Sequence, residues 1–295
     1  MIPFTTILTH PGSAHKDEFI ACCLLVATRP APVLRREPTE ADLADPSVAV
    51  VDVGHRHEPA LNNFDHHQLP RDQRPTCSIS LILDQLGLYA DAREFCDWLE
   101  TAEWFDCRGP NDTARWLGVD RELVNKLHSP VDGALLRVFS QSARLAPGDA
   151  LWEIMRLVGD DILGYLRDLR ARLDFIGRHA ERWSVAPGAN SGADALAHEV
   201  LFLPRTDPMP EDPSAGVDRY VARQGLVGRV IGTITPDRRG EGYGLSRFRD
   251  HPRLDFTRIQ AEPDVRFVHA SGFVAKTSAT EPQRLRALLQ RALVD

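Results

Sequence analysis

The sequence lacks the features that mark membrane-spanning, secreted and disulfide-stabilised proteins. Its longest apolar run, Ile20–Ala27, is far too short to cross a bilayer. The first ten residues have neither a basic leader nor a cleavage pattern, so we expect no secretion signal. The five cysteines form no Cys-x-x-Cys pair, and their odd number fits reduced, mostly buried thiols. These absences predict a cytoplasmic protein with no membrane partner.

Lysine is scarce, because Lys16, Lys126 and Lys276 are the only three, and the basic charge is therefore almost entirely arginine. The net charge is −7, yet the segment 218–295 carries 14 basic and 9 acidic residues. An acidic first part and a basic last part fit a metal site facing a phosphate-binding surface, with chance as the alternative. Arginine also suits bidentate phosphate contacts, although genome composition can produce the same bias.

Strand-like and helix-like segments alternate in the first part of the chain. Three segments predict strands or strand ends, the second of them buried on both faces: Pro3–Thr9, Ser47–Gly54 and Asn63–Gln68. Three others predict helices from their apolar spacing: His15–Ala27, Ser78–Leu88 and Ala92–Phe105. Such alternation predicts an α/β layer architecture with right-handed crossovers.

The rest of the chain reads as a long helical region and an α+β unit. Residues 112–184 look mainly helical, with an amphipathic stripe from Asp149 to about Trp183, and Pro187–Gly192 is a candidate junction. Strand-like runs follow, with a closing helix at Glu281–Leu293: Glu199–Leu203, Tyr220–Ala222, Gly228–Thr235 and Val265–His269. We therefore predict an N-terminal domain over residues 1–145, a connecting helical segment over 146–186 and a C-terminal domain over 187–295.

Histidines are crowded near the start, where six of the eleven fall within the first 67 residues. Histidine and acidic side chains gather at predicted strand ends and helices in four clusters: His10-x4-His15-x-Asp17, Asp52, Asp65-His66-His67 and Asp106. In an open α/β sheet the carboxyl ends of the strands open into one crevice, so these clusters can converge. Imidazoles and carboxylates suit a divalent first-row ion, and more than four ligands suggest two ions. Such an ion pair is the usual clamp for phosphoryl displacement.

Several motifs resemble one known family. The segments are Thr9–Glu18 (THPGSAHKDE), Val51–Gly54 (VDVG), Asn63–Gln68 (NFDHHQ), Ser78–Gly87 and Phe267–Phe273 (FVHASGF). Together and in this order they resemble the melanocyte-proliferating-gene exonuclease family, a branch of the DHH phosphoesterases. The resemblance implies a DHH-type N-terminal lobe, with a mainly parallel sheet flanked by helices, and a smaller α+β C-terminal lobe. Residues 1–145 would then be the metal-binding catalytic domain and residues 187–295 the substrate-binding domain.

The resemblance also implies roles for individual residues. The metal ligands would be His10, His15, Asp17, Asp52, His66 and Asp106, with Asp52 bridging two divalent ions. Mn²⁺ is favoured, with Mg²⁺ and Co²⁺ as alternatives, and the ions would activate the attacking water. The catalytic residues would be Asp52, His67 close to the transferred phosphate and Asp65 orienting its neighbours. Substrate phosphate would be held by Arg247 and His269, with Arg249 and Lys16 as further candidates.

Departures from the family pattern leave the substrate open. Lys16 stands where the family has Ala, the usual Asp-Asn-Gly is Asp106–Gly109 (DCRG), and a Gly pair is missing after Phe273. We expect a metal-dependent phosphoesterase resembling a 3′–5′ exonuclease, acting on short or single-stranded nucleic acid, with RNA favoured. The alternatives are hydrolysis of a small phosphoanhydride or cyclic (di)nucleotide and a catalytically inactive, metal-containing binding protein. The oligomeric state stays open, with a homodimer among the alternatives.

Overall fold

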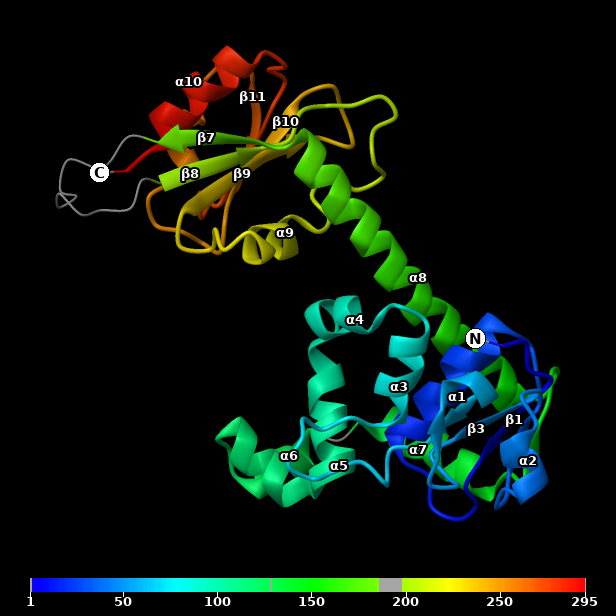
Figure 1. Ribbon diagram of the computed structural model, residues 1–295. Helices are drawn as coiled ribbons and strands as arrows, with labels where there is room; N and C mark the ends of the chain where they lie inside the picture. The colour runs from blue at the N-terminus through cyan, green and yellow to red at the C-terminus, as the bar shows by residue number, and fades with distance from the viewer. Residues whose placement is uncertain (1, 128, 186–197, 295) are drawn as a thin grey trace. The chain divides into compact units, whose positions relative to one another are not determined.

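Two units, each built on its own six-stranded sheet, make up the fold (Figure 1). The computed structural model describes residues 2–127, 129–185 and 198–294. The first unit is Met1–Asp168 and the second is Leu169–Asp295, so the boundary falls inside helix α8 (Ala150–His179). The predicted junction Pro187–Gly192 lies outside the described residues.

The sheet of the first unit has parallel strands at its centre and antiparallel strands at both edges. The order is β4 (His57–Glu58), β5 (Asn63–Phe64), β3 (Val48–Val51), β1 (Thr6–Thr9), β2 (Val33–Arg35) and β6 (Arg144–Leu145). Strands β5, β3, β1 and β2 run parallel, whereas β4 and β6 pair antiparallel with β5 and β2. The sheet is therefore mixed, and the expectation of a mainly parallel sheet was wrong. A short 3₁₀ turn, η1 (Pro59–Leu61), joins β4 to β5, and so short a connection suits antiparallel pairing rather than a crossover.

The register of the central strands brings three strand ends to one edge of this sheet. Thr9 lies opposite Val51, and Val51 lies opposite Phe64. Because the strands are parallel, the residues that follow them leave the sheet side by side. The predicted strands at Pro3–Thr9 and Ser47–Gly54 are thus present in shorter form.

The helices of the first unit are α1 (Lys16–Thr28), α2 (Glu40–Ala44), α3 (Ser78–Gln85), α4 (Tyr89–Phe95), α5 (Asp97–Leu117), α6 (Arg121–Lys126) and α7 (Pro130–Gln141). Helix α1 is buried on every side from Asp17 to Val26, as its apolar sequence requires. The single predicted helix Ala92–Phe105 is instead divided between α4 and α5 at Cys96. Helix α5 is interrupted at Gly109, where φ is 74° and Pro110 follows.

Helix α8 approaches α1 so closely that a glycine is required at the crossing. A Cβ atom on Gly159 would lie 2.0 Å from the backbone oxygen of Cys23 and 2.8 Å from the Cβ of Ala27. Cys23 is fully buried, as the sequence predicts for this thiol. The long amphipathic helix expected from Asp149 onward is present, and its stripe packs on the unit's core through buried residues such as Met155 and Leu166.

The sheet of the second unit is largely antiparallel. Its order is β11 (Val265–Val268), β12 (Val274–Thr277), β10 (Tyr243–Arg247), β9 (Val230–Pro236), β8 (His198–Phe202) and β7 (Glu181–Val185). Among the described strands of this second sheet, β8 and β9 are the one parallel pair. Helix α10 (Pro282–Ala292) packs its buried leucines on the core around Trp183 and Phe202. This unit is mixed α and β, as expected.

The predicted strand at Tyr220–Ala222 was wrong, because these residues belong to helix α9 (Val217–Arg223). Val217 and Val221 are one helical turn apart and are buried against Ile176 and neighbouring apolar residues. A three-residue apolar run is too short to distinguish a helix from a strand, so the pattern could not decide. In the part of the chain that the structure describes, no helix combines the length and the apolar character needed to span a membrane.

We predict that Gly159→Ala destabilises the protein by about 1–3 kcal/mol, since the added methyl group overlaps the α1 backbone. Urea denaturation followed by circular dichroism measures the change. Gly164→Ala is the matched control in the same helix, because nothing lies within 4 Å of its Cβ position. It should be neutral or stabilising by up to about 1 kcal/mol. Equal effects of the two substitutions would contradict the close helix crossing.

Candidate metal centre

The predicted ligands come from strand ends and helix termini of the first unit. His10 follows β1, Asp52 follows β3, and the Asp65–His67 triplet follows β5. His15 is the N-cap residue of α1, with Asp17 in the first turn of that helix. Asp106 is supplied by α5. Parallel strand ends and the start of the following helix therefore gather side chains that are far apart in the sequence.

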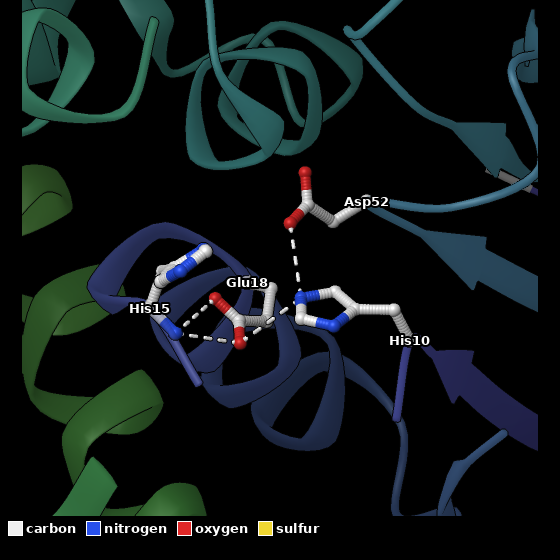
Figure 2. Close-up of side chains that lie close together, drawn as sticks. All are labelled: His10, His15, Glu18 and Asp52. Atoms are coloured by element: carbon white, nitrogen blue, oxygen red, sulfur yellow. Dashed lines mark hydrogen bonds and ion pairs between the residues drawn. The ribbon is translucent and has the colours of Figure 1, made fainter. Parts of the chain in front are cut away.

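One group of donors consists of His10, His15, Glu18 and Asp52, whose ligand atoms all lie within 4.8 Å of one another. Figure 2 shows the His10 ring between two carboxylates. His10 Nε2 is 3.3 Å from Glu18 Oε1 and 3.5 Å from Asp52 Oδ2. Glu18 also accepts hydrogen bonds from the His15 backbone N–H at 2.7 and 2.8 Å, which closes a capping box at the start of α1.

A second group is centred on His66. Its Nε2 atom is 3.0 Å from Asp52 Oδ1 and 3.0 Å from Asp106 Oδ2. The two oxygens of Asp52 thus face different imidazoles, His66 through Oδ1 and His10 through Oδ2. Ser78, at the start of α3, donates a hydrogen bond to Oδ1 at 2.8 Å. A carboxylate placed in this way could contact two cations, one through each oxygen.

Asp52 adopts an unusual backbone conformation, with φ at 60°. A non-glycine residue in the left-handed region costs roughly 1–3 kcal/mol, and such residues gather at functional sites. Asp52 is also buried. The positive φ at a buried carboxylate therefore marks position 52 as a candidate member of a functional site.

Asp17 provides the test of whether these residues fit a cation. Its side chain is 2% exposed, and neither carboxylate oxygen has a hydrogen-bond partner among the described residues. One of its oxygens lies within 4.8 Å of a donor atom of His15 and of Asp106. A buried carboxylate without a partner is costly, and a bound divalent ion would remove this cost. The nitrogen and oxygen donors of both groups suit such an ion.

The charges of the centre shift its pKa values in opposite directions. Burial raises the pKa of Asp17, and the neighbouring Asp52 and Asp106 carboxylates raise it further. Hydrogen bonds to Asp52 and Glu18 raise the pKa of His10 to about 10. Burial would raise the pKa of Asp52, but the hydrogen bonds from His10 and His66 outweigh it and hold that pKa low. The centre therefore concentrates negative charge that protons on the imidazoles partly balance, and a cation would take their place.

Asp65 and His67 lie beside the second group. Asp65 is fully buried, and its Oδ1 is 2.7 Å from His67 Nδ1. Its Oδ2 accepts the backbone N–H of His55 at 2.7 Å. The hydrogen bond to Asp65 raises the pKa of His67, whose side chain is half exposed. Asp65 therefore fixes the ring of His67 while the opposite ring nitrogen stays available to a substrate.

The predicted substrate residues are distributed over both units. Lys16 lies in the first unit, where its ammonium pairs with Asp132 of α7 at 2.8 Å. In the second unit the exposed Arg249 pairs with Asp218 at 3.0 Å. Both side chains thus already have carboxylate partners, which would compete with a phosphate.

Arg247 and His269 lie together in the second unit. The backbone N–H of Arg247 donates to Phe273 O at 2.8 Å, and the His269 and Phe273 rings are 4.2 Å apart. Arg247 Nη2 is 3.8 Å from Asp255 Oδ1, and its buried Nε has no partner among residues that the structure describes. Gly272, whose φ is 66°, lies next to this guanidinium. A Cβ atom at position 272 would be only 3.1 Å from Arg247 Nη2, so the absence of a side chain there leaves room for the guanidinium.

Three residues near the centre were missed by the sequence analysis as members of the site: Glu18, Ser78 and Cys107. Glu18 could have been found from the sequence, because it follows His15 by three residues, which is the spacing of a capping box. For Ser78, the sequence offered only its position at the start of a predicted helix. Cys107, which forms a further group with His66 and Asp106, is recognisable as a neighbour of His66 only in three dimensions.

One comparison with known proteins gives a match. The sequence model of the MYG1_exonuc family, described as "Uncharacterised protein family (UPF0160)", matches residues 6–81. No curated protein and no solved structure matches the chain. The matched segment contains all the predicted metal ligands except Asp106. Residues 6–81 are thus similar to this family, in agreement with the motifs that carry the resemblance.

We predict that Asp17→Asn raises the stability of the metal-free protein by about 1–3 kcal/mol, because it removes a buried, unpartnered carboxyl group whose ionised form is disfavoured on folding. The same substitution should reduce the stabilisation produced by added Mn²⁺. Urea denaturation with EDTA and with excess Mn²⁺ measures both effects.

Asp42→Asn is the control for Asp17→Asn, because the Asp42 carboxylate is paired with Arg36 and caps α2. This substitution should lower stability equally with and without Mn²⁺. A loss of metal-free stability in Asp17→Asn would contradict the view of Asp17 as an unpartnered ligand.

Proposed function

We propose that the protein is a metal-dependent phosphodiesterase of the exonuclease type, acting on short or single-stranded nucleic acid through a centre of two divalent ions. The observation that carries this proposal is Asp52, whose two oxygens face His10 and His66 in separate donor groups. The name of the matching family, MYG1_exonuc, supports an exonuclease activity. Mn²⁺ is the ion we favour because the family resemblance implies it, and imidazole and carboxylate ligands suit a divalent first-row ion in general.

In this proposal the six predicted ligands divide around the shared Asp52. One ion would be held by the donors around His10 and His15, and the other by His66 and Asp106. The unpartnered Asp17, which forms a group with His15 and Asp106, would complete the second set. When bound, such ions supply Lewis-acid stabilisation of phosphate charge and activation of water. Glu18 adds a fourth donor to the first group, although its bonds to the start of α1 also give it a structural role.

His67 is the residue that we propose donates a hydrogen bond or proton to the phosphate. The Asp65 carboxylate holds Nδ1 of His67 at 2.7 Å, which fixes the ring and favours its protonated form. The half-exposed His67 ring can reach a substrate in solution, whereas His66 is buried. The two adjacent histidines thus have different roles, His66 as ligand and His67 as acid.

The second unit supplies the features that favour a nucleic acid. We propose that Arg247 and His269 contact phosphate, because the guanidinium suits bidentate phosphate binding. Phe273 lies against His269 and is 38% exposed, so its ring can stack on a base. An exposed aromatic ring beside two nitrogen-bearing side chains favours a nucleotide chain over a simple phosphoanhydride.

We predict that Asp52→Asn and His66→Ala each lower Mn²⁺-dependent phosphodiesterase activity about 100-fold or more while the fold is retained, since each removes a donor from the centre. The measurement is cleavage of labelled single-stranded RNA and DNA oligomers, with dinucleotides, cyclic dinucleotides and pyrophosphate in parallel. Asp45→Asn, an exposed carboxylate in the loop after α2, serves as the matched control. Hydrolysis of pyrophosphate alone would replace the nuclease by a small-molecule hydrolase, and no hydrolysis across the panel would contradict catalysis.

We predict that Arg247→Ala raises KM for an oligonucleotide by about 10-fold or more, because one good charge-assisted contact is worth roughly 1.5–3 kcal/mol. The bound Mn²⁺ should not change, since Arg247 belongs to the second unit and is not among the proposed ligands. Arg239→Ala, on an exposed turn of the same unit, provides the comparison. Loss of metal in Arg247→Ala, or an unchanged KM, would remove this residue from substrate binding.

A further inference from the structure

Cys107 contacts the one ring nitrogen of His66 that does not face the carboxylates. Its Sγ atom is 3.9 Å from His66 Nδ1, and its thiol can donate to the backbone oxygen of Thr76 at 3.3 Å or to Asp106 Oδ2 at 3.9 Å. Within the described part of the chain, Nδ1 of His66 has no other hydrogen-bond partner. The opposite nitrogen, Nε2, is 3.0 Å from both Asp52 and Asp106.

The segment that carries Cys107 is fixed from both sides. Cys107 lies in the last turn of α5 before the break at Gly109, directly after Asp106. The next residue, Arg108, donates from Nη2 to the backbone oxygens of Arg71 and Gln73, the latter at 2.7 Å. This turn of α5 is therefore tied to the loop that follows the Asp65–His67 triplet. The thiol is thus held in place beside the His66 ring.

The contact between Cys107 and His66 is of a kind that metal-binding histidines usually make. A histidine that presents one nitrogen to a metal ion usually donates its other N–H to an acceptor, which fixes the tautomer and the ring rotation. The Cys107 thiol has two acceptors for its own hydrogen, Thr76 O at 3.3 Å and Asp106 Oδ2 at 3.9 Å, so its sulfur lone pairs can accept Nδ1–H of His66. Sulfur is larger than oxygen, which fits the long 3.9 Å contact.

We infer that Cys107 is a positioning residue: it accepts a hydrogen bond from Nδ1 of His66 and so directs Nε2 toward Asp52 and Asp106. The inference rests on the proposed function in one respect, namely that His66 is a metal ligand. Cys107 acts through His66 and does not itself bind the ion. The donor set of the centre then consists of nitrogen and oxygen alone, which suits Mn²⁺ better than a thiophilic ion.

The test is Mn²⁺ affinity of the full-length chain, measured by isothermal titration calorimetry rather than by activity. Cys107→Ala should weaken the affected Mn²⁺ site by about 10- to 100-fold, the usual cost of losing such a partner. Cys107→Ser keeps a hydroxyl that can accept from Nδ1 and donate to Thr76, and it should restore most of the affinity. Cys96→Ser, at the N-cap of α5, is the control thiol and should bind Mn²⁺ like the wild type.

A double-mutant cycle with His66 separates positioning from a general structural effect. In the His66→Ala background, Cys107→Ala should change Mn²⁺ affinity no further, because the ring that it positions is gone. Circular dichroism of the metal-free Cys107→Ala protein checks that the fold is intact. An unchanged Mn²⁺ affinity in Cys107→Ala, or an equal loss with and without His66, would overturn the positioning role.

Cobalt loading distinguishes positioning from ligation. A thiolate-to-cobalt charge-transfer band in the wild type that disappears in Cys107→Ser would make Cys107 a ligand and would overturn the inference. Failure of the proposed function gives a different result, since the wild-type chain would then bind no Mn²⁺ or would bind it without hydrolysing any substrate. A wild-type chain that binds no Mn²⁺ would overturn both proposals. A wild-type chain that binds Mn²⁺ but hydrolyses no substrate would overturn only the proposed function, and the Mn²⁺ affinities of the Cys107 variants would still test the positioning role.

Discussion

The parallel alignment of β1, β3 and β5 is the constraint on which the centre depends. With Thr9 opposite Val51 and Val51 opposite Phe64, the next residues along the three strands are His10, Asp52 and Asp65. A shift of one residue in either pairing would turn alternate side chains to the other face and separate these groups. The arrangement of the donors is thus a property of backbone pairing before any ion is bound.

Two layers of packing around this edge maintain its geometry. Helix α1, which begins just after His15 and carries Asp17 in its first turn, is buried along almost its whole length and meets α8 at Gly159 near Cys23 and Ala27. On the other side, the buried Glu103 of α5 accepts hydrogen bonds from Ser80 at 2.8 Å and Tyr89 at 2.6 Å. This carboxylate joins the helix that supplies Asp106 to the helix whose Ser78 contacts Asp52.

How much the sequence predicts depends on how local each signal is. The clusters at His10, Asp52 and His66 could be placed at strand ends, because apolar runs bounded by turn residues mark buried strands. The antiparallel edges could not be predicted, since strands of two residues such as β4 carry almost no pattern. Tyr220–Ala222 failed for the same reason, because a short apolar run fits a helix and a strand equally. In the site, Cys107 could not be assigned to His66, because its contact joins residues 41 positions apart.

The left-handed backbone at Asp52 restricts which amino acids this position accepts. Among acidic residues, aspartate enters that region far more readily than glutamate, because a short polar side chain can be accommodated there. Asparagine tolerates the conformation but has no charge, and glycine tolerates it but has no ligand atoms. Backbone geometry and charge therefore both favour aspartate at position 52.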